Sequence, residues 1–341
     1  MRARLSRAAL GALLAIALPR PASALDLAQP DVREFVEQVV EHDHLPRAWV
    51  ENVLAAAEPK PAIIEAISKP AEHVRPWFEY RAVFLTERRI REGREFVVAH
   101  APELAAATRD SGVPGEIIAA IVGVETSYGR IMGSYRVVDA LATLAFGYPP
   151  RASYFRGELE QFLLLAREAR FDPLKALGSY AGAMGACQFM PRSYRAFAVD
   201  ANGDGRIDLW SSWPDIIASV AHYFAVHGWR AGEPVAAVAD LWNPDVEELP
   251  SGRVDLNASI EALRAKGLSF GTPLAADAPA VFVALRDADS PEYRVGFHNF
   301  WVITRYNHSA MYALAVADLA AAIAAPGPGE PALATTRGAH R

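Results

Sequence analysis

The spacing of apolar residues predicts helices over most of the chain. Between residues 26 and 110 the apolar positions recur at three- and four-residue steps, as in Phe35, Val36, Val39 and Val40. Asp31 stands near the expected start of that helix. A second helical run, "TERRIREGREFVVAHAPELAAATRDSG", continues the pattern and stops at Gly112. The first third of the chain therefore reads as helical.

The pattern changes twice further along the chain. Residues 113 to 230 carry helices broken by glycine- and proline-containing turns, and most residues suited to chemistry fall there. From 231 to 305, the short β-branched or alternating runs "AVFVALRD", "EYRVGF" and "FWVITRY" predict a small sheet. The run "SAMYALAVADLAAAIAA" returns to helical spacing. We therefore expect a mainly α (α+β) protein with a small antiparallel β domain.

The first 24 residues have the pattern of a cleaved secretory signal, with arginines, an apolar centre and the small residues Ala22 and Ala24. The apolar run 8–19 would reach roughly 18 Å as a helix, too short for a ~30 Å hydrocarbon core. The expected domains are a signal peptide (1–24), a helical domain (25–112, joined by a C-terminal helix 308–325), a catalytic core (113–230), a β-rich domain (231–307) and a disordered tail (326–341). We expect an exported protein without a membrane span.

Charge and cysteine content narrow the class of partner. Without residues 1–24 the chain keeps 30 Lys and Arg against 40 Asp and Glu, a net charge of −10. This acidic balance argues against nucleic acid as a partner, because phosphate binding needs a basic face. Cys187 is the only cysteine, so no internal disulfide can form. Stability outside the cytosol must come from packing or from a bound ion.

One acid, Glu125, stands at the end of the apolar run "IVGVETSYGR". Helical spacing places it on the stripe of Ile118, Ile121 and Val122, with Tyr128 one turn further on. Burial and the negative end of the helix dipole should both raise the pKa of Glu125. A carboxylic acid that stays protonated near neutral pH is what a general acid at a glycosidic oxygen must be. From position alone, an acid at a fraying helix end that turns to solvent remains open.

The segment "DANGDGRID" matches an EF-hand calcium loop over most of its length. Positions 1, 3, 5 and 6 are taken by Asp200, Asn202, Asp204 and Gly205. Arg206 would offer its carbonyl oxygen, Ile207 would pack inward, and Asp208 would stand at position 9. Ser211 replaces the usual glutamate at position 12, and Asp215 is the candidate to complete the shell. The alternatives are an ion-free Asp/Asn/Gly turn and, for Asp215, a capping box with Ser212.

Five blocks in order resemble the lytic murein transglycosylase B family. They are "GVPGEIIAAIVGVETSYGR", "RVVDALATLAFGYPPRASYFRGELEQFLLLARE", "GSYAGAMGACQFMPRSYRAFAVD", "ANGDGRIDLW" and "VITRYNHSAMYALAV". The likeness covers roughly residues 75 to 320. It implies a lysozyme-like core, cleavage of the MurNAc-GlcNAc linkage of peptidoglycan with a 1,6-anhydro product, and Ca²⁺ in the loop.

The resemblance also assigns roles to single residues. Glu125 matches the family's catalytic acid/base. The positions that match residues used around the glycan are Tyr80, Arg151, Tyr154, Ser179, Gln188, Tyr223, Tyr306 and Asn307. Two features depart from the family: Pro150 stands where a second arginine is frequent, and "LWSSWPD" is one residue longer than expected.

Most glycosidases pair two carboxylates, and nothing near Glu125 in the sequence is an obvious second one. We interpret the nearest acids, Asp139 and Glu158, as surface or capping groups. The resemblance implies that Glu125 acts first as acid and then as base, helped by the substrate's own N-acetyl group. A hydrolytic muramidase and a non-catalytic, calcium-stabilised wall-binding protein remain as alternatives. Partner proteins, exo- or endo-cleavage and oligomeric state do not follow from the sequence; the family likeness adds the periplasm as location.

Overall fold

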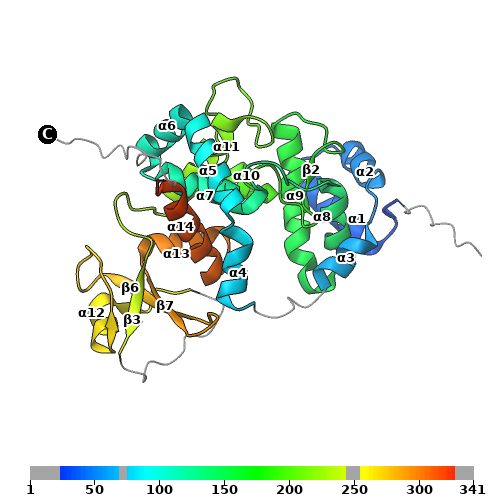
Figure 1. Cartoon of the computed structure of the whole chain (residues 1–341). Helices are drawn as coiled ribbons and strands as arrows, with labels where there is room; N and C mark the ends of the chain where they lie inside the picture. The colour runs from blue at the N-terminus through cyan, green and yellow to red at the C-terminus, as the bar shows by residue number, and fades with distance from the viewer. Residues whose placement is uncertain (1–23, 69–74, 243–253, 327–341) are drawn as a thin grey trace, which may run out of the picture.

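The computed structural model describes residues 24–68, 75–242 and 254–326. Within those ranges the chain forms fourteen α-helices, a two-stranded ladder and a five-stranded antiparallel sheet (Figure 1). The predicted mainly helical class with a small antiparallel sheet is confirmed. The predicted signal peptide and C-terminal tail lie outside the described residues, apart from Ala24 and Pro326.

The first three helices lie beside two helices from the middle of the chain (Figure 1). The helices α1 (Pro30–Glu41), α2 (Arg47–Ala55) and α3 (Pro61–Ser68) are grouped with α8 (Val137–Gly147) and α9 (Ala152–Glu168). Phe35 of α1 meets Phe146 edge to face, with ring centroids 5.7 Å apart. Val36 and Val39 are buried, as the spacing predicted, so the first expected helix is confirmed.

The next three helices belong to a different group. The helices α4 (Trp77–Phe84), α5 (Glu87–Ala99) and α6 (Ala101–Ser111) pack against α7 (Gly115–Thr126), α11 (Trp213–Val226) and α14 (Ala310–Ala324). The run expected as one helix is broken at His100, because Pro102 has no backbone N–H for a helix interior and favours the start of a new helix. Gly112 ends α6 at φ +73°, as predicted.

The domain boundaries stay a prediction, but the contacts add one fact. The helices before residue 112 divide between two groups: α1 to α3 lie at one end of the molecule beside α8 and α9, and α4 to α6 lie with α7, α11 and α14 (Figure 1). The short helix α10 (Pro191–Phe197) packs on both α9 and α11. It therefore connects the two groups.

The sheet forms a separate small layer with strand order β4-β6-β7-β3-β5. Its long strands are β3 (Ala236–Leu241), β6 (Pro279–Leu285) and β7 (Glu292–Gly296); β4 (Ala258–Ser259) and β5 (Leu268–Ser269) are short edges. Phe282 pairs with Val295 across β6 and β7. These two residues, with Ile260 and Leu263 of α12 (Ile260–Ala265), belong to a hydrophobic cluster of their own. The predicted strands "AVFVALRD" and "EYRVGF" are confirmed.

The prediction of a strand at "FWVITRY" is wrong, because this segment is the helix α13 (His298–Tyr306). Phe300, Val302 and Ile303 are fully buried, and α13 packs against α14 and β7. A short apolar run buried on several sides shows no periodicity that separates a strand from a helix. Packing against α14 therefore decides the structure, and β-branched residues are tolerated in it.

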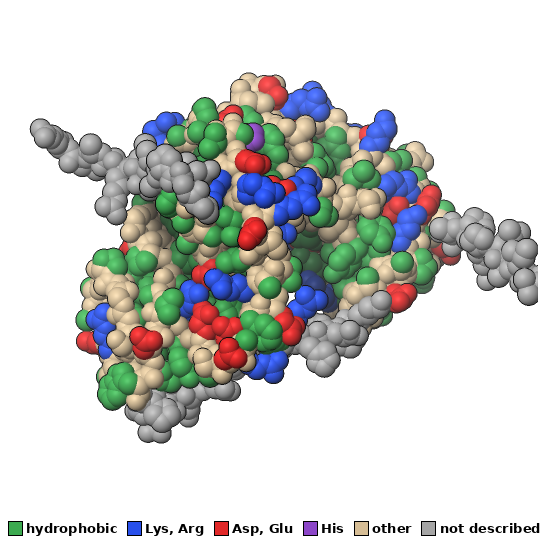
Figure 2. Space-filling view, viewed as in Figure 1, with side chains coloured by type: hydrophobic (Ala, Val, Ile, Leu, Met, Phe, Trp, Pro, Cys, Tyr) green, Lys and Arg blue, Asp and Glu red, His purple; other side chains and the backbone are tan. Residues whose placement is uncertain are grey.

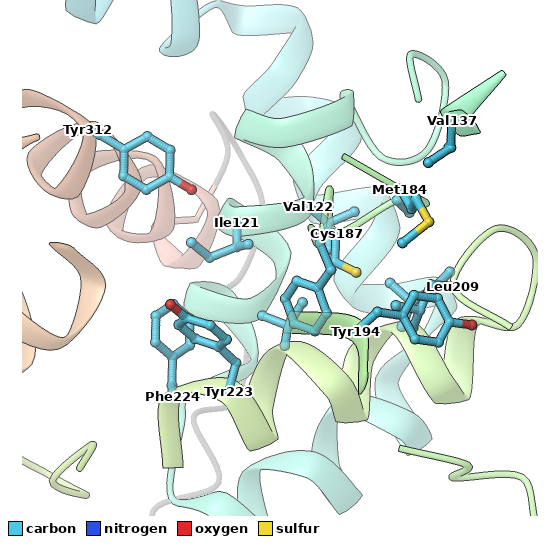
Figure 3. Packing of buried hydrophobic residues seen from close by; sticks show 14 of the residues in the cluster. Ile121, Val122, Val137, Met184, Cys187, Tyr194, Leu209, Tyr223, Phe224 and Tyr312 are labelled. Carbon is cyan, nitrogen blue, oxygen red and sulfur yellow. The ribbon is translucent and has the colours of Figure 1, made fainter. Parts of the chain in front are cut away.

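The helix α7 crosses the centre of the molecule. Its residues Ile118, Ile121 and Val122 are fully buried. Figure 3 shows Ile121 between Tyr312 of α14 and the aromatic residues Tyr223 and Phe224 of α11, with Val122 beside Cys187. The helix that carries Glu125 is thus buried along most of its length. Across the three described ranges, no helix combines the length and the apolar character needed to cross a bilayer.

Candidate active site

Glu125 is the penultimate residue of α7, as its sequence position predicted. The helix does not continue to Tyr128, because Ser127, Tyr128 and Gly129 all have left-handed backbone, with φ +50°, +61° and +80°. Tyr128 therefore leaves the Glu125 stripe, and its hydroxyl donates to the Arg89 carbonyl oxygen at 2.9 Å. The helix end is fixed by this turn.

The Glu125 side chain is partly exposed, and it is anchored by one hydrogen bond. The Tyr312 hydroxyl donates to Glu125 Oε1 at 2.5 Å. Burial raises the pKa of Glu125 to about 7, and the hydrogen bond from Tyr312 acts in the opposite direction. The carboxyl group therefore exchanges its proton near neutral pH.

Two further tyrosines lie near this carboxyl group, and a third packs on one of them. Tyr80 of α4 has a raised pKa, from burial and then from the charge of Glu125. Tyr306 of α13 donates to the Cys187 carbonyl oxygen at 2.5 Å, and burial followed by the charges of Cys187 and Glu125 holds its pKa well above the usual value. Tyr223 of α11 packs on Tyr306 with centroids 4.8 Å apart. The structure thus brings Tyr80 and Tyr306 to Glu125, with Tyr223 behind Tyr306.

Ser179 and Gln188 lie in the glycine-rich loop beside this group. The short ladder of β1 (Tyr135–Arg136) and β2 (Leu177–Gly178) brings the loop next to the segment after α7. Ser179 Oγ accepts the N–H groups of Ala181 and Ala183, which holds the turn. Gln188 Nε2 donates to the carbonyl oxygens of Met132 and Gly185. Both side chains hold the shape of this loop.

The remaining predicted glycan residues lie on exposed positions. The Arg151 guanidinium lies 4.5 Å from the centroid of the Tyr154 ring, at the start of α9. Pro150 belongs to the 3₁₀ turn that precedes them. Asn307 is exposed directly after α13. The structure records no contact of these side chains with Glu125.

The expectation that Asp139 and Glu158 are surface or capping groups is wrong in its surface part, since their exposed fractions are 1% and 2%, and its capping part holds for Glu158. Asp139 accepts hydrogen bonds from the Glu58 N–H and from Arg136 Nε. Glu158 accepts the Arg192 N–H at the start of α10, so it caps a helix other than its own. Both acids are buried because neighbouring helices supply donors for them. Within the described ranges, Glu125 forms no ion pair and has no carboxylate partner.

The acidic loop 200–208 has the backbone of the predicted turn. Gly205 has φ +82°, and Ile207 is partly buried as expected. The oxygens of Asp200, Asn202 and Asp204 accept N–H groups within the loop. In the part of the chain that the structure describes, three or more acidic, histidine or cysteine side chains gather nowhere as a metal site would require.

Asp215 is fully buried and holds the loop from α11. Its two oxygens accept the N–H groups of Ala201, Asn202 and Asp208. The capping box considered with Ser212 is not formed, since the Ser212 side chain makes no cap hydrogen bond at the start of α11. The carboxylate is turned toward the loop because three N–H groups there lack any other acceptor.

Tyr312 is the hydrogen-bond partner of Glu125 that the sequence reasoning missed. It lies 187 residues from Glu125, so no local spacing connects the two. A tyrosine on the buried face of a helix needs a hydrogen-bond partner, and that was the available signal.

Figure 2 shows this face of the molecule hollowed between the part with α4 and the part with α8 and α9. Two cavities lie elsewhere in the molecule, one of 590 Å³ between α6 and α11 and one of 400 Å³ between α7, α14 and β3. Glu125 lines neither of them, so both are separate from the candidate site.

The chain belongs to the Transglycosylase SLT domain family, whose model matches residues 27–321. It is 42% identical over 304 residues to the membrane-bound lytic murein transglycosylase B of Escherichia coli (strain K12), covering 86% of this chain and 83% of that protein. The expected family is thereby confirmed.

Two solved structures extend the likeness to the fold. Soluble lytic transglycosylase SltB1 from Pseudomonas aeruginosa matches with a TM-score of 0.83 and 48% identity, over 86% of this chain and 98% of that one. Escherichia coli Slt35 in complex with calcium matches with a TM-score of 0.79 and 42% identity, over 88% and 94%. The expectation of a lysozyme-like core with a small sheet is confirmed.

Proposed function

We propose that this protein is a peptidoglycan lytic transglycosylase that cleaves the MurNAc-GlcNAc bond without water and leaves 1,6-anhydroMurNAc ends. The observation that carries the proposal is a single carboxyl group, Glu125, with a pKa of about 7 and no second carboxylate beside it among the described residues. The relatives named as lytic transglycosylases support the same reaction class.

One carboxyl group near neutrality can take two roles in sequence. Protonated Glu125 donates its proton to the glycosidic oxygen as the bond from that oxygen to C1 of MurNAc breaks. The N-acetyl group of the substrate stabilises the anomeric centre. The C6 hydroxyl then attacks C1, and its proton returns to Glu125. Tyr312 orients Oε1 throughout, while Oε2 has no partner among the described residues and is available to the substrate.

The glycan-binding roles are proposed for the residues predicted from sequence. Exposed Tyr154 and Arg151 offer an aromatic face and a cation that suit a sugar and a carboxylate. Tyr80 offers a hydroxyl close to Glu125. Tyr223 and Tyr306 donate their hydroxyl protons to backbone carbonyls, so they form the wall of the site and accept from the glycan. We propose the same glycan-binding role for Ser179, Gln188 and Asn307.

Digestion of purified sacculi with product analysis by mass spectrometry tests the reaction. We expect anhydromuropeptides from the wild type and a loss of roughly a hundredfold or more in Glu125→Gln, because general acid-base catalysis is removed. Glu95→Gln, an exposed glutamate on α5, is the matched control and should keep full activity. Reducing ends would favour the muramidase. An inactive wild type that still sediments with peptidoglycan would favour the wall-binding protein.

We also propose that the acidic loop binds Ca²⁺ as a structural ion. The donor chemistry fits, because Asp200, Asn202 and Asp204 offer side-chain oxygens, and each oxygen that accepts one N–H keeps a second lone pair. The Arg206 carbonyl, Asp208 and Asp215 are the further candidates. Slt35, solved in complex with calcium, supports the proposal.

A chelator should lower the melting temperature and added Ca²⁺ should restore it, since a ligand of the native state stabilises that state. Calorimetry with and without EDTA measures this. Asp204→Asn should abolish the response, whereas Asp110→Asn, on the exposed surface of α6, should keep it. A melting temperature that does not respond to either reagent would contradict the calcium proposal.

We propose export to the periplasm. The N-terminal segment supports it, with its arginines, apolar centre and small residues. Murein is also the polymer named in the Escherichia coli relative. Fractionation of cells that express the full chain, with detection of the shortened protein, tests it.

A further inference from the structure

The turn that follows Glu125 is held in an unfavourable backbone conformation. Ser127, Tyr128 and Gly129 are left-handed in succession, and two of them carry side chains for which this conformation is costly. Within the turn, the Gly129 N–H donates to Thr126 Oγ1 at 2.9 Å. Thr126 is the neighbour of Glu125 in the chain. Contacts from outside the turn must supply the rest of its stability.

Trp213, the first residue of α11, supplies such a contact. A Cβ atom on Gly129 would lie 3.1 Å from Trp213 Cη2, so the indole ring packs directly on the glycine backbone. The same ring meets Phe96 edge to face at 5.0 Å and His100 at 5.1 Å. Phe96 in turn lies 5.5 Å from the Tyr128 ring. Trp213 and Phe96 therefore both pack on the turn and contact each other.

We propose that Trp213 is a positioning residue for Glu125: its ring holds the left-handed turn after α7 and thereby fixes the carboxyl group against Tyr312. The kinetic part of this inference rests on the proposed function.

Trp213 acts through the backbone, since other groups face the carboxyl itself. Those groups are Tyr312 from α14, Tyr80 from α4, Tyr306 from α13 and Cys187 from the glycine-rich loop. His100 is the titratable group that faces Trp213. Removal of the indole takes away a ring contact of His100 but none of the four groups that face Glu125, so a change at Glu125 reports the position of the turn.

The test compares Trp213→Leu and Trp213→Phe with the wild type. In Trp213→Leu we expect kcat on sacculi to fall roughly tenfold with KM within twofold, because a small displacement of a catalytic group has a large kinetic effect. The alkaline limb of the pH profile should move below the wild-type value, since a loosened turn admits water to Glu125. Trp213→Phe keeps the contact with Phe96 but lacks the atoms that reach Gly129. Its kcat and the alkaline limb of its pH profile should therefore lie between those of the wild type and of Trp213→Leu. Trp242→Leu, at a tryptophan that is 72% exposed, is the control and should change nothing.

A second readout is independent of activity. The pH dependence of unfolding, measured with and without Glu125→Gln in each background, reports the pKa of Glu125 directly. An inactive wild type would sink the proposed function, yet this readout would still test the positioning role. If both variants only lower the melting temperature, while kcat per folded molecule and the pKa of Glu125 match the wild type, the inference is overturned. An unchanged pKa and kcat in Trp213→Phe overturns it even where Trp213→Leu fails to fold.

Discussion

Position 125 has a carboxyl group, although a neutral side chain there would make the folded protein more stable at neutral pH. Its pKa is about 7 in the folded protein and 4.5 as an ordinary glutamate. The folded state therefore binds the proton more tightly than the unfolded chain does. The contribution of Glu125 protonation to the free energy of unfolding is fully present below pH 4.5. It is lost as the pH rises to about 7, where the native protein also releases the proton. The property that makes the residue useful in catalysis thus costs stability at neutral pH.

Glu125→Gln should remove this cost. At pH 8 we expect the variant to be more stable than the wild type by on the order of 3 kcal/mol, because each pKa unit corresponds to about 1.4 kcal/mol. Near pH 4 the two proteins should be equal, since both side chains are then neutral. Urea unfolding between pH 4 and 8 measures the difference. Glu95→Gln on exposed α5 should show no such pH dependence; an equal pH response in both variants would contradict the assignment.

At the scale of elements, patterns with one buried face could be predicted from the sequence. The helix α1 follows its apolar period, since Val32, Phe35, Val36 and Val39 are its buried residues. The run that became α13 could not be predicted, because burial on several sides removes the period and only the packing partner decides. Local patterns are therefore sufficient where an element lies at the boundary between core and solvent.

The candidate site also has one part that the sequence predicts and one part that it does not. The position of Glu125 at a helix end and its apolar surroundings follow from spacing within one helix. Its hydrogen bond with Tyr312 joins residues 187 positions apart, which no local pattern contains. The acidic loop shows the matching limit, since the order of its residues predicts the turn but not whether the carboxylates face an ion or the backbone. Sequence located these groups, and the packing of distant elements set their partners.

At the scale of the whole molecule, one group of polar side chains joins the sheet to the helical body. Arg294 of β7 donates through both terminal nitrogens to Asp318 of α14, each at 3.1 Å. Glu292, beside it on β7, accepts from Arg294 and from Trp77 Nε1 of α4. Arg81 of α4 completes the group with a 3.3 Å contact to Asp318. The strand β7 and the helix α14 are thus joined through the guanidinium group of Arg294, and α4 binds the two carboxylates that flank it.

Arg294→Met should loosen this joint. We expect a loss of about 2 kcal/mol, less than for a fully buried pair, because Asp318 and Glu292 keep some exposure but lose their main partner. Hydrogen-deuterium exchange should accelerate in β3 and β7 before it does in α7, since the sheet has its own core and needs the joint only to stay attached. Arg47→Met removes an exposed ion pair with Glu37 and should change the free energy of unfolding little, without this local pattern of exchange. Equal acceleration in β7 and α7 would show instead that sheet and helices unfold as one unit.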